Sequence, residues 1–263
     1  MRFFKKRFPE NHMVLYPLGD FHYGSRQCDE KFIRQVVDEI KNMENAYWVS
    51  MGDLIENALV GSKSDVYTQT VPPTEQMEYV VNLLKPIAHK GLFGVAGNHE
   101  QRSMRLAGLI PEQYMMARLG LPYMGFSCLA YFIMSQCKSP KAFQVYFHHN
   151  YGGGYTVGGK VNKAEALRRI VPTADAVFSA HSHITDRMLT TWFECGRDQI
   201  IEHVGYNYII GSTLRWDKSY AEEKAKPAAA CELIKVTFVG SNNGRATDSR
   251  KQIYEIIRPG EMQ

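Results

Sequence analysis

Short apolar runs that end abruptly in polar residues recur along the chain. Their length of about five residues and their content of β-branched and aromatic side chains are typical of buried strands. The five runs that matter lie at residues 13–18, 47–51, 92–96, 143–147 and 175–180. Glycine, aspartate, asparagine or histidine follows each run directly, so each predicted strand ends in side chains that can bind a metal ion.

Helical periodicity separates several of these runs. Between the first two, apolar residues at helical spacing predict a helix over residues 32–43, with Asp29 as its N-cap. A second helix is predicted over residues 74–88, and a shorter one over residues 162–170, ending before Pro172. Strands that alternate with helices in this way indicate an α/β fold.

Beyond residue 190 the pattern changes to one dominated by strands. They are predicted at residues 201–214, 231–239 and 252–257, and the Ser-Asn-Asn-Gly sequence at 241–244 is a hairpin signal. We therefore expect one domain over residues 1–263, with added β structure from about residue 190 to 263 rather than a separate domain.

Two stretches lack regular periodicity and are candidates for functional loops. Residues 57–73 form the first, and residues 150–160 form the second, which contains five glycines. The second is interpreted as the rim of an active site, with a plain surface loop as an equal alternative. Aromatic residues near the predicted loops could stack on nucleic-acid bases, although ordinary packing is the simpler explanation for most of them. They are Tyr23, Tyr67, Tyr151, Tyr155, Tyr206, Tyr208 and Trp216.

Composition is that of an ordinary globular protein, with 44% hydrophobic and 22% charged residues among 263. No apolar run reaches the ~18 residues of a membrane span, and no signal-peptide pattern is present. Five scattered cysteines without a Cys-x-x-Cys pair indicate neither a disulfide framework nor a structural zinc site, so we expect a cytoplasmic protein. The net charge of +4 permits an anionic substrate but does not identify a nucleic-acid binder.

Acidic residues follow the first two strands. Asp20 and His22 can point to the same side of an extended segment, because side chains two residues apart do so. Asp53 lies in Gly-Asp-Leu-Ile-Glu and has two carboxylate oxygens with which it could bridge two cations. Taken alone, each aspartate is better explained as a cap of the following turn.

The motif Gly97-Asn98-His99-Glu100 is more specific. An amide oxygen at Asn98 can bind a hard cation without adding charge, while the adjacent imidazole of His99 stays free for acid chemistry. An asparagine-glycine turn is the alternative.

Histidines cluster after the last two strands. His148 and His149 are adjacent, and His181 and His183 are separated by one serine. Imidazole is the commonest nitrogen ligand of zinc, iron and manganese, so clustered histidines at strand ends favour a metal site.

In this order and spacing, the five motifs resemble those of the calcineurin-like metallophosphoesterase superfamily, over residues 13–190. The resemblance implies a four-layer α/β sandwich, with two β-sheets flanked by helices and with ligands at the carboxyl ends of the strands. Within this superfamily, the chain is similar in particular to phosphoesterases of phages and bacteria.

The resemblance also implies a set of ligands for two metal ions. The first ion would be held by Asp20, His22, Asp53 and His183, and the second by Asp53, Asn98, His148 and His181. Asp53 would bridge the two ions. His149 is the alternative to His148, because Asn150 stands where the family usually has proline or glycine.

Two such ions would activate water and stabilise the oxygens of an in-line displacement at phosphorus. His99 would protonate the leaving alkoxide. Asn98 and Arg102 would also contact the substrate, Arg102 by charge-assisted hydrogen bonds to a phosphate oxygen, although a solvated arginine is as good an interpretation. Mixed ligands of this kind suit manganese, iron, zinc, cobalt or nickel.

We therefore expect a metal-dependent phosphoric ester hydrolase that cuts phosphodiester bonds, with nucleic acid or nucleotides as candidate substrates and no membrane partner. A phosphomonoesterase acting on a protein, nucleotide or metabolite is the alternative. A catalytically silent binding scaffold is a third function, against which the intact set of ligand residues argues.

Overall fold

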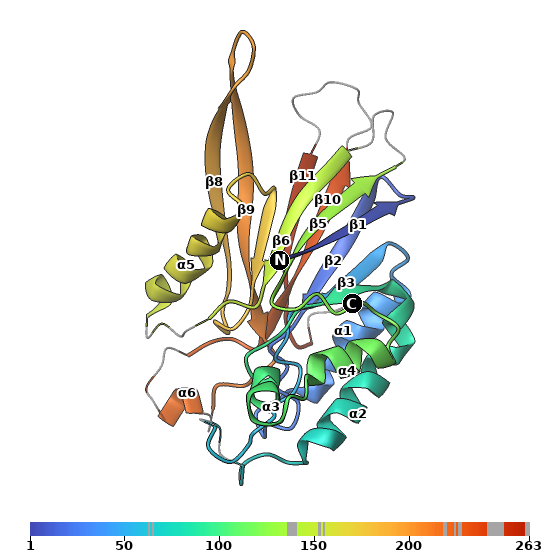
Figure 1. Cartoon of the computed structure of the whole chain (residues 1–263), viewed down its shortest axis with the longest axis vertical. Coiled ribbons are helices and arrows are strands. Elements are labelled where there is room, and N and C mark those ends of the chain that lie inside the picture. The colour runs from blue at the N-terminus through green and yellow to red at the C-terminus, as the bar shows by residue number, and fades with distance from the viewer. Residues whose placement is uncertain are drawn as a thin grey trace.

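One curled β-sheet dominates the computed structural model (Figure 1). The structure describes residues 1–62, 64, 66–135, 141–151, 154, 156–217, 220–223, 225, 228–240 and 250–260. In this part of the chain the sheet has eleven strands, and its two halves face each other.

The first half of the sheet is mixed and combines three strands from the first hundred residues with the last two strands of the chain. Its strands β2, β3 and β4 pair in parallel, and β10 joins them antiparallel between β2 and β11. The strands are β2 (His12–Leu18), β3 (Ala46–Ser50), β4 (Gly91–Gly94), β10 (Glu232–Gly240) and β11 (Arg250–Ile257).

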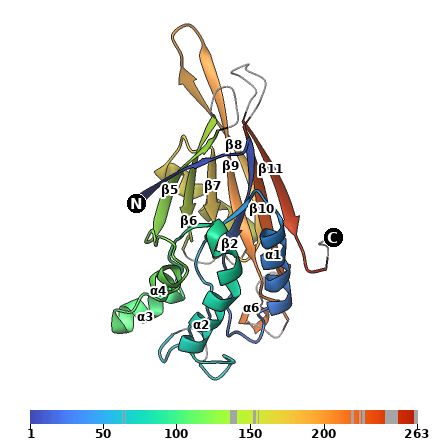
Figure 2. The ribbon, with the colours of Figure 1, turned by 90° about the vertical axis from the view of Figure 1, so that its right-hand side faces the viewer.

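The second half follows the order β1-β5-β6-β7-β9, with β8 paired to β9. Its β8–β9 hairpin projects beyond the rest of the sheet as a two-stranded arm (Figure 2). The strands are β1 (Arg2–Phe8), β5 (Ser127–Met134), β6 (Lys141–His148), β7 (Ala176–Ser179), β8 (Thr185–Cys195) and β9 (Ile200–Ser212).

The strands β9 and β10 lie in the middle of the strand order, where they connect the two halves of the sheet. Strand β9 pairs with β7 over residues 206–209 and then with β10 at Gly211 and Ser212. Gly211 has a φ of +86°, and a Cβ there would lie 2.1 Å from the carbonyl oxygen of Glu232. Glycine is therefore required at this junction.

Three buried clusters separate four layers. Alternate residues of β2 show the principle, because Met13 and Leu15 point into the core between the two halves and Val14 and Tyr16 point to the outer face. Helices α1, α2 and α4 cover that outer face, and α5 with its following turn covers the outer face of the second half. The predicted four-layer α/β sandwich is confirmed.

The helices agree with the periodicity where it was strong. The first predicted helix is α1, and Asp29 caps it by accepting the N–H of Phe32 at 2.9 Å. The third begins earlier than predicted, because Thr156 caps it by accepting the N–H of Gly159. The helices are α1 (Glu30–Asn42), α2 (Pro73–Leu84), η1 (Lys85–Lys90), α3 (Glu100–Ala107), α4 (Pro111–Arg118), α5 (Val157–Ala166), η2 (Leu167–Ile170) and α6 (Tyr220–Glu223).

Several elements were not predicted, namely β1, β5, most of β8 and the short helices α3, α4 and α6. The hairpin of β10 and β11 is confirmed by their antiparallel pairing. Its predicted turn at 241–244 lies outside the described residues. No helix in the described ranges is both long and apolar enough to cross a bilayer.

Candidate metal centre

The polar residues that follow five strands meet at one end of the sheet. Three groups of side chains offer ligand atoms within 4.8 Å of one another. The groups share members, so they form one continuous centre. They are Asp20 with His22 and His183, His22 with Asp53 and His99, and Asp53 with His149 and His181.

Backbone strain is concentrated in this centre. Five of the candidate ligands have a positive φ between 48° and 68°, a region that residues other than glycine rarely adopt. Each such residue costs on the order of 1–3 kcal/mol and persists only where the surroundings enforce it. The five are Asp20, His22, Asp53, His181 and His183. Strain of this kind clusters at functional sites.

Glycine at position 97 allows the two central motifs to touch. A Cβ on Gly97 would lie 2.1 Å from the backbone nitrogen of Asp53 and 2.3 Å from its Oδ1. The close approach lets Oδ1 of Asp53 accept the N–H of His99 at 2.8 Å. The orientation of this carboxylate is therefore fixed by the neighbouring motif.

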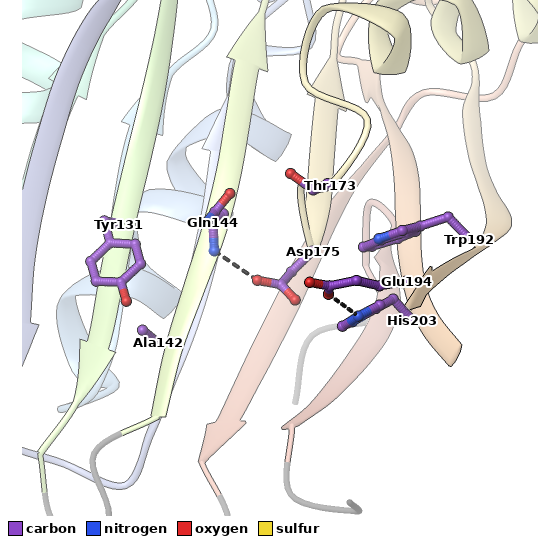
Figure 3. A pocket seen from close by; sticks show the side chains of 8 residues that line it. All are labelled: Tyr131, Ala142, Gln144, Thr173, Asp175, Trp192, Glu194 and His203. Carbon is purple, nitrogen blue, oxygen red and sulfur yellow. Dashed lines mark hydrogen bonds and ion pairs between the residues drawn. The ribbon is translucent and has the colours of Figure 1, made fainter. Parts of the chain in front are cut away.

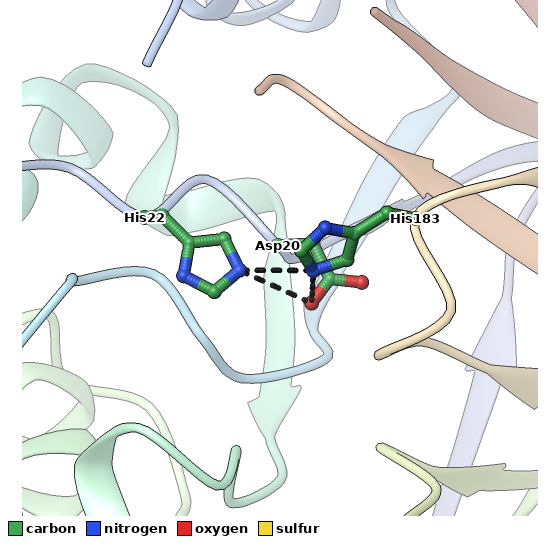
Figure 4. A group of neighbouring side chains, drawn as sticks. All are labelled: Asp20, His22 and His183. Atoms are coloured by element: carbon green, nitrogen blue, oxygen red, sulfur yellow. Dashed lines mark hydrogen bonds and ion pairs between the residues drawn. The ribbon is translucent and has the colours of Figure 1, made fainter. Parts of the chain in front are cut away.

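The first group lies between the ends of β2 and β7 (Figure 4). Nε2 of His22 is 3.1 Å from Nε2 of His183, and these atoms lie 3.7 Å and 3.5 Å from Oδ1 of Asp20. The other oxygen of Asp20 accepts the N–H of His181 at 2.7 Å. One carboxylate oxygen and two imidazole nitrogens thus converge on a single point.

The second group is built around Oδ2 of Asp53. Nε2 of His149 lies 3.1 Å from this oxygen and 3.0 Å from Oδ1 of Asn98. Nε2 of His22 lies 3.9 Å from the same oxygen. His181 completes the group. Because its Oδ2 faces both groups, Asp53 is placed to bridge them.

At one position the structure differs from the sequence-based choice, since His149 and not His148 enters the centre. Phe143, Val145 and Phe147 of β6 point into the core between the sheet halves, so His148 points to the opposite face. There its Nδ1 accepts the N–H of Asn150 at 2.7 Å. His149 is buried, and its Nδ1 donates to the carbonyl of Met51 at 2.7 Å, which aims Nε2 at Asp53.

His99 lies beside the two groups with Arg102. Its Nδ1 is 2.7 Å from the carbonyl oxygen of Glu56, and its Nε2 is 2.8 Å from Nη2 of Arg102. Since a guanidinium only donates, Nε2 of His99 accepts this hydrogen bond and Nδ1 carries the proton. Burial lowers the pKa of His99 to about 4, against the opposing effect of Asp53.

Two carboxyl groups support the centre that sequence reasoning left without a role. Glu100 is buried and accepts the N–H groups of Asp53 and Leu54 at 2.9 Å and 2.8 Å, which holds the turn after β3. The carboxylate of Glu56 lies 3.3 Å from Nδ1 of His22. Both residues stand within the quoted motifs, so their position next to predicted ligands was the available signal.

In the metal-free centre, protons on histidines balance the charge of the buried aspartates, and a metal cation would replace these protons. Although burial opposes its charge, the neighbouring carboxylates of Asp20 and Glu56 raise the pKa of His22 to about 10. Burial likewise opposes the charge of His149, but the carboxylate of Asp53 raises its pKa to about 9. Despite burial, neighbouring histidines hold the pKa values of Asp20 and Asp53 below their usual range.

Unsatisfied atoms indicate that the residues fit metal ions. Oδ1 of Asp20 and Oδ2 of Asp53 are buried and accept no hydrogen bond within the described structure. Leaving buried polar atoms unpaired is costly, and both of these atoms face imidazole nitrogens. Carboxylate oxygens and neutral imidazoles around a common point are a donor set suited to transition-metal ions.

A separate cavity of about 230 Å³ lies on the outer face of the second sheet half (Figure 3). Glu194 accepts from Nε2 of His203 at 2.8 Å there, and Asp175 accepts the N–H of Gln144. None of the candidate metal ligands lines this cavity, so it is not part of the centre. Its lining residues are Tyr131, Ala142, Gln144, Thr173, Asp175, Trp192, Glu194 and His203.

Comparison with known proteins finds similarity at the level of structure only. No protein-family model and no curated protein matches the sequence. Among solved structures, a protein described as a predicted phosphoesterase from Streptococcus pneumoniae TIGR4 is 11% identical, with a TM-score of 0.34, covering 93% of this chain and 98% of that one.

Two further solved structures are similar to this chain. Vps29 from Entamoeba histolytica, complexed with Zn²⁺, is 13% identical with a TM-score of 0.40, covering 93% of this chain and 99% of that one. The calcineurin-like phosphoesterase YfkN from Bacillus subtilis is 14% identical with a TM-score of 0.40, covering 94% and 91%. Because all three TM-scores are below 0.5, the assignment of a function to this chain depends on its own motifs and geometry and not on these similarities.

Proposed function

We propose that this chain is a calcineurin-like metallophosphoesterase that hydrolyses phosphodiester bonds with two bound metal ions. The observation that carries the proposal is that Oδ2 of Asp53 faces two neighbouring groups of aspartate and histidine side chains. Supporting it, the strain and the unpaired carboxylate oxygens are both concentrated at this centre.

Each ion has a complete set of candidate ligands. Asp20, His22, Asp53 and His183 would hold the first ion. The second would be held by Asp53 together with Asn98, His149 and His181, where His149 replaces the His148 of the sequence-based set. Manganese, iron, zinc, cobalt and nickel all remain candidates, and a cytoplasmic location remains a prediction.

When bound, the two metal ions would supply an activated water and positive charge that stabilises the phosphoryl oxygens. The chain's own residues then orient the ester. Arg102 presents a guanidinium beside His99, and a bound phosphate would compete for its Nη2 donor. Once Arg102 turns to the phosphate, Nε2 of His99 is free to take up a proton from water and to pass it to the leaving-group oxygen.

The carboxylate of Glu56 supports a diester over a monoester as the substrate. A monoester dianion carries one more negative charge, and the carboxylate of Glu56 lies 3.9 Å from Arg102 and 3.7 Å from His99. The extra charge would therefore meet an acidic group beside the very residues that contact phosphate. Phosphomonoester hydrolysis is the alternative function.

The test is metal reconstitution followed by assays on bis-p-nitrophenyl phosphate, p-nitrophenyl phosphate and cyclic nucleotides. We expect two ions per chain and faster hydrolysis of diesters. Asp53→Asn should abolish activity, whereas His203→Ala, which removes a histidine paired with Glu194 on the projecting arm, should not change it. A faster rate on monoesters would favour the alternative function, and two bound ions without any hydrolysis would favour a silent scaffold.

A further inference from the structure

Two exposed aromatic side chains belong to segments that run next to the metal centre. Phe126 exposes 58% of its surface and Tyr151 exposes 68%. Tyr151 follows His149 by two residues in the chain, and Phe126 follows a residue that is hydrogen-bonded to the segment leading into Asn98. Large apolar side chains exposed at the mouth of a polar site are candidates for contact with the substrate.

Phe126 lies where the two halves of the sheet meet. The segment before it runs parallel to β4, with Tyr123 opposite Gly94 and the carbonyl of Gly125 accepting the N–H of Ala96 at 2.8 Å. Phe126 therefore lies about one strand spacing, roughly 5 Å, from the backbone that leads into Asn98. On its other side, the next residue, Ser127, pairs with His148 at the end of β6.

Tyr151 lies on the other side of the same histidine pair. It is two residues beyond His149, and its N–H donates to Oδ1 of Asn150 at 2.8 Å. Asn150 is buried and has a φ of +81°, so the chain turns sharply after the ligand. The turn leaves the Tyr151 side chain in solvent, two residues beyond His149 in the chain.

Packing explains several of the other aromatic residues of the chain. Tyr23 stacks on Tyr79 with ring centroids 3.7 Å apart, and Tyr208 is fully buried in the core. Within the described structure, Phe126 and Tyr151 stack on no other ring. Their faces are therefore available to a planar ligand group.

We propose that Phe126 and Tyr151 form a base-stacking subsite, and that the substrates are nucleotidyl phosphodiesters. The inference rests on the proposed diesterase function and specifies its substrate class. A base stacked at this rim would place its own phosphate over the second ligand group, around Asn98 and His149. Stacking on an aromatic side chain is tolerant of sequence, because every base has a π-face.

The test compares a thymidine dinucleotide with an analogue that lacks the bases, using the metal-reconstituted full chain. Phe126→Ala and Tyr151→Ala should each lower kcat/KM for the dinucleotide by roughly 5- to 100-fold and leave the abasic analogue unchanged. Phe126→Trp and Tyr151→Trp should restore the rate. A uridine dinucleotide and an oligothymidylate show whether sugar or chain length matters.

Phe193→Ala is the matched control. Phe193 is 68% exposed on the projecting arm, roughly 26 Å along β8 from Thr185, which follows the centre. It should leave both substrates unaffected. Equal losses on dinucleotide and abasic analogue in the rim variants, or no loss on either, would overturn the subsite.

A binding measurement separates this inference from the proposed activity. The metal-free protein is titrated with end-labelled oligothymidylate and with its abasic counterpart, and fluorescence anisotropy is followed. Tighter binding of the base-containing strand, lost in both alanine variants, supports the subsite even if no diester is cleaved. Equal affinities in the wild-type protein would refute it even if diesters are cleaved.

Discussion

Replacing His149 with alanine should remove one metal ion, and replacing His148 should not. The two residues are adjacent in sequence, so the pair offers a matched comparison. His149 is buried with its Nε2 3.1 Å from Oδ2 of Asp53, whereas His148 lies on the other face of β6. We expect about one ion per chain in His149→Ala and two in His148→Ala.

The magnitude follows from the contacts that each histidine makes. Changes one shell beyond a metal ligand already lower affinity by 10- to 100-fold, so the loss of the ligand itself should lower it by more than ~100-fold. In the metal-free protein, His149→Ala leaves Oδ2 of Asp53 without its nearest partner, at a cost of about 3–5 kcal/mol. His148→Ala removes one hydrogen bond from Asn150, worth about 1 kcal/mol.

Metal analysis after equilibrium dialysis measures the first effect, and thermal unfolding of the metal-free variants measures the second. At roughly 2–4 °C per kcal/mol, His149→Ala should lower Tm by about 6–20 °C and His148→Ala by only a few degrees. His149→Gln keeps a polar side chain of similar size, and it distinguishes loss of the ligand from loss of the fold. Two ions in His149→Ala together with one in His148→Ala would refute the reasoning from strand alternation.

Three further predictions concern the same centre. Asp53→Asn should reduce both sites, because its Oδ2 faces both ligand groups; metal analysis checks this, and one fully occupied site in the variant would contradict it. His99→Ala should retain both ions and slow unactivated diesters by ~100-fold or more, while p-nitrophenyl esters are affected much less; equal losses on both would assign His99 to positioning. The metal-free protein should lose stability as pH rises from about 6.5 to 10, because the raised pKa values of His149 (about 9) and His22 (about 10) mean that the folded chain keeps protons the unfolded chain has released. Thermal unfolding at pH 6 and pH 9.5 tests it, and a higher Tm at pH 9.5 would contradict it.

Elements with a strong local signal were predictable from the sequence. The first helix combines an N-cap at Asp29 with an apolar face that includes Phe32 and Val36, so its start and orientation depend on neighbouring residues. The strand β1 lacks such a signal, because its basic residues lie on an exposed edge. Its pairing with β5 is set by residues more than 100 positions away, which local pattern does not reveal.

The ligand from β6 was predictable in principle, and the motif comparison obscured it. Alternation of Phe143, Val145 and Phe147 sets the inward face of the strand, and continuing it by two residues reaches His149. Adjacent histidines look equivalent in a motif. They differ only once the buried face of the preceding strand is considered.

The left-handed conformations of the ligands were beyond the reach of sequence, because each is imposed by another motif. Asp20 donates its N–H to the carbonyl of Gly52, and His22 donates to that of Asp53. Asp20 in turn accepts the N–H of His181. Asp20, His22 and His181 are thus each held by a hydrogen bond to a segment that follows a different strand.

Those bonds also explain why a set of motifs far apart in sequence acts as one unit. Asp20 and Asp53 come from one half of the sheet, and His149 and His181 come from the other, so the centre exists only when the halves are closed against each other. Any ion that binds both halves stabilises the closed fold in proportion to the logarithm of its concentration over its dissociation constant. If the centre binds metal ions, chain closure, backbone strain and metal affinity form one coupled equilibrium, and each candidate ligand then contributes to folding as well as to chemistry.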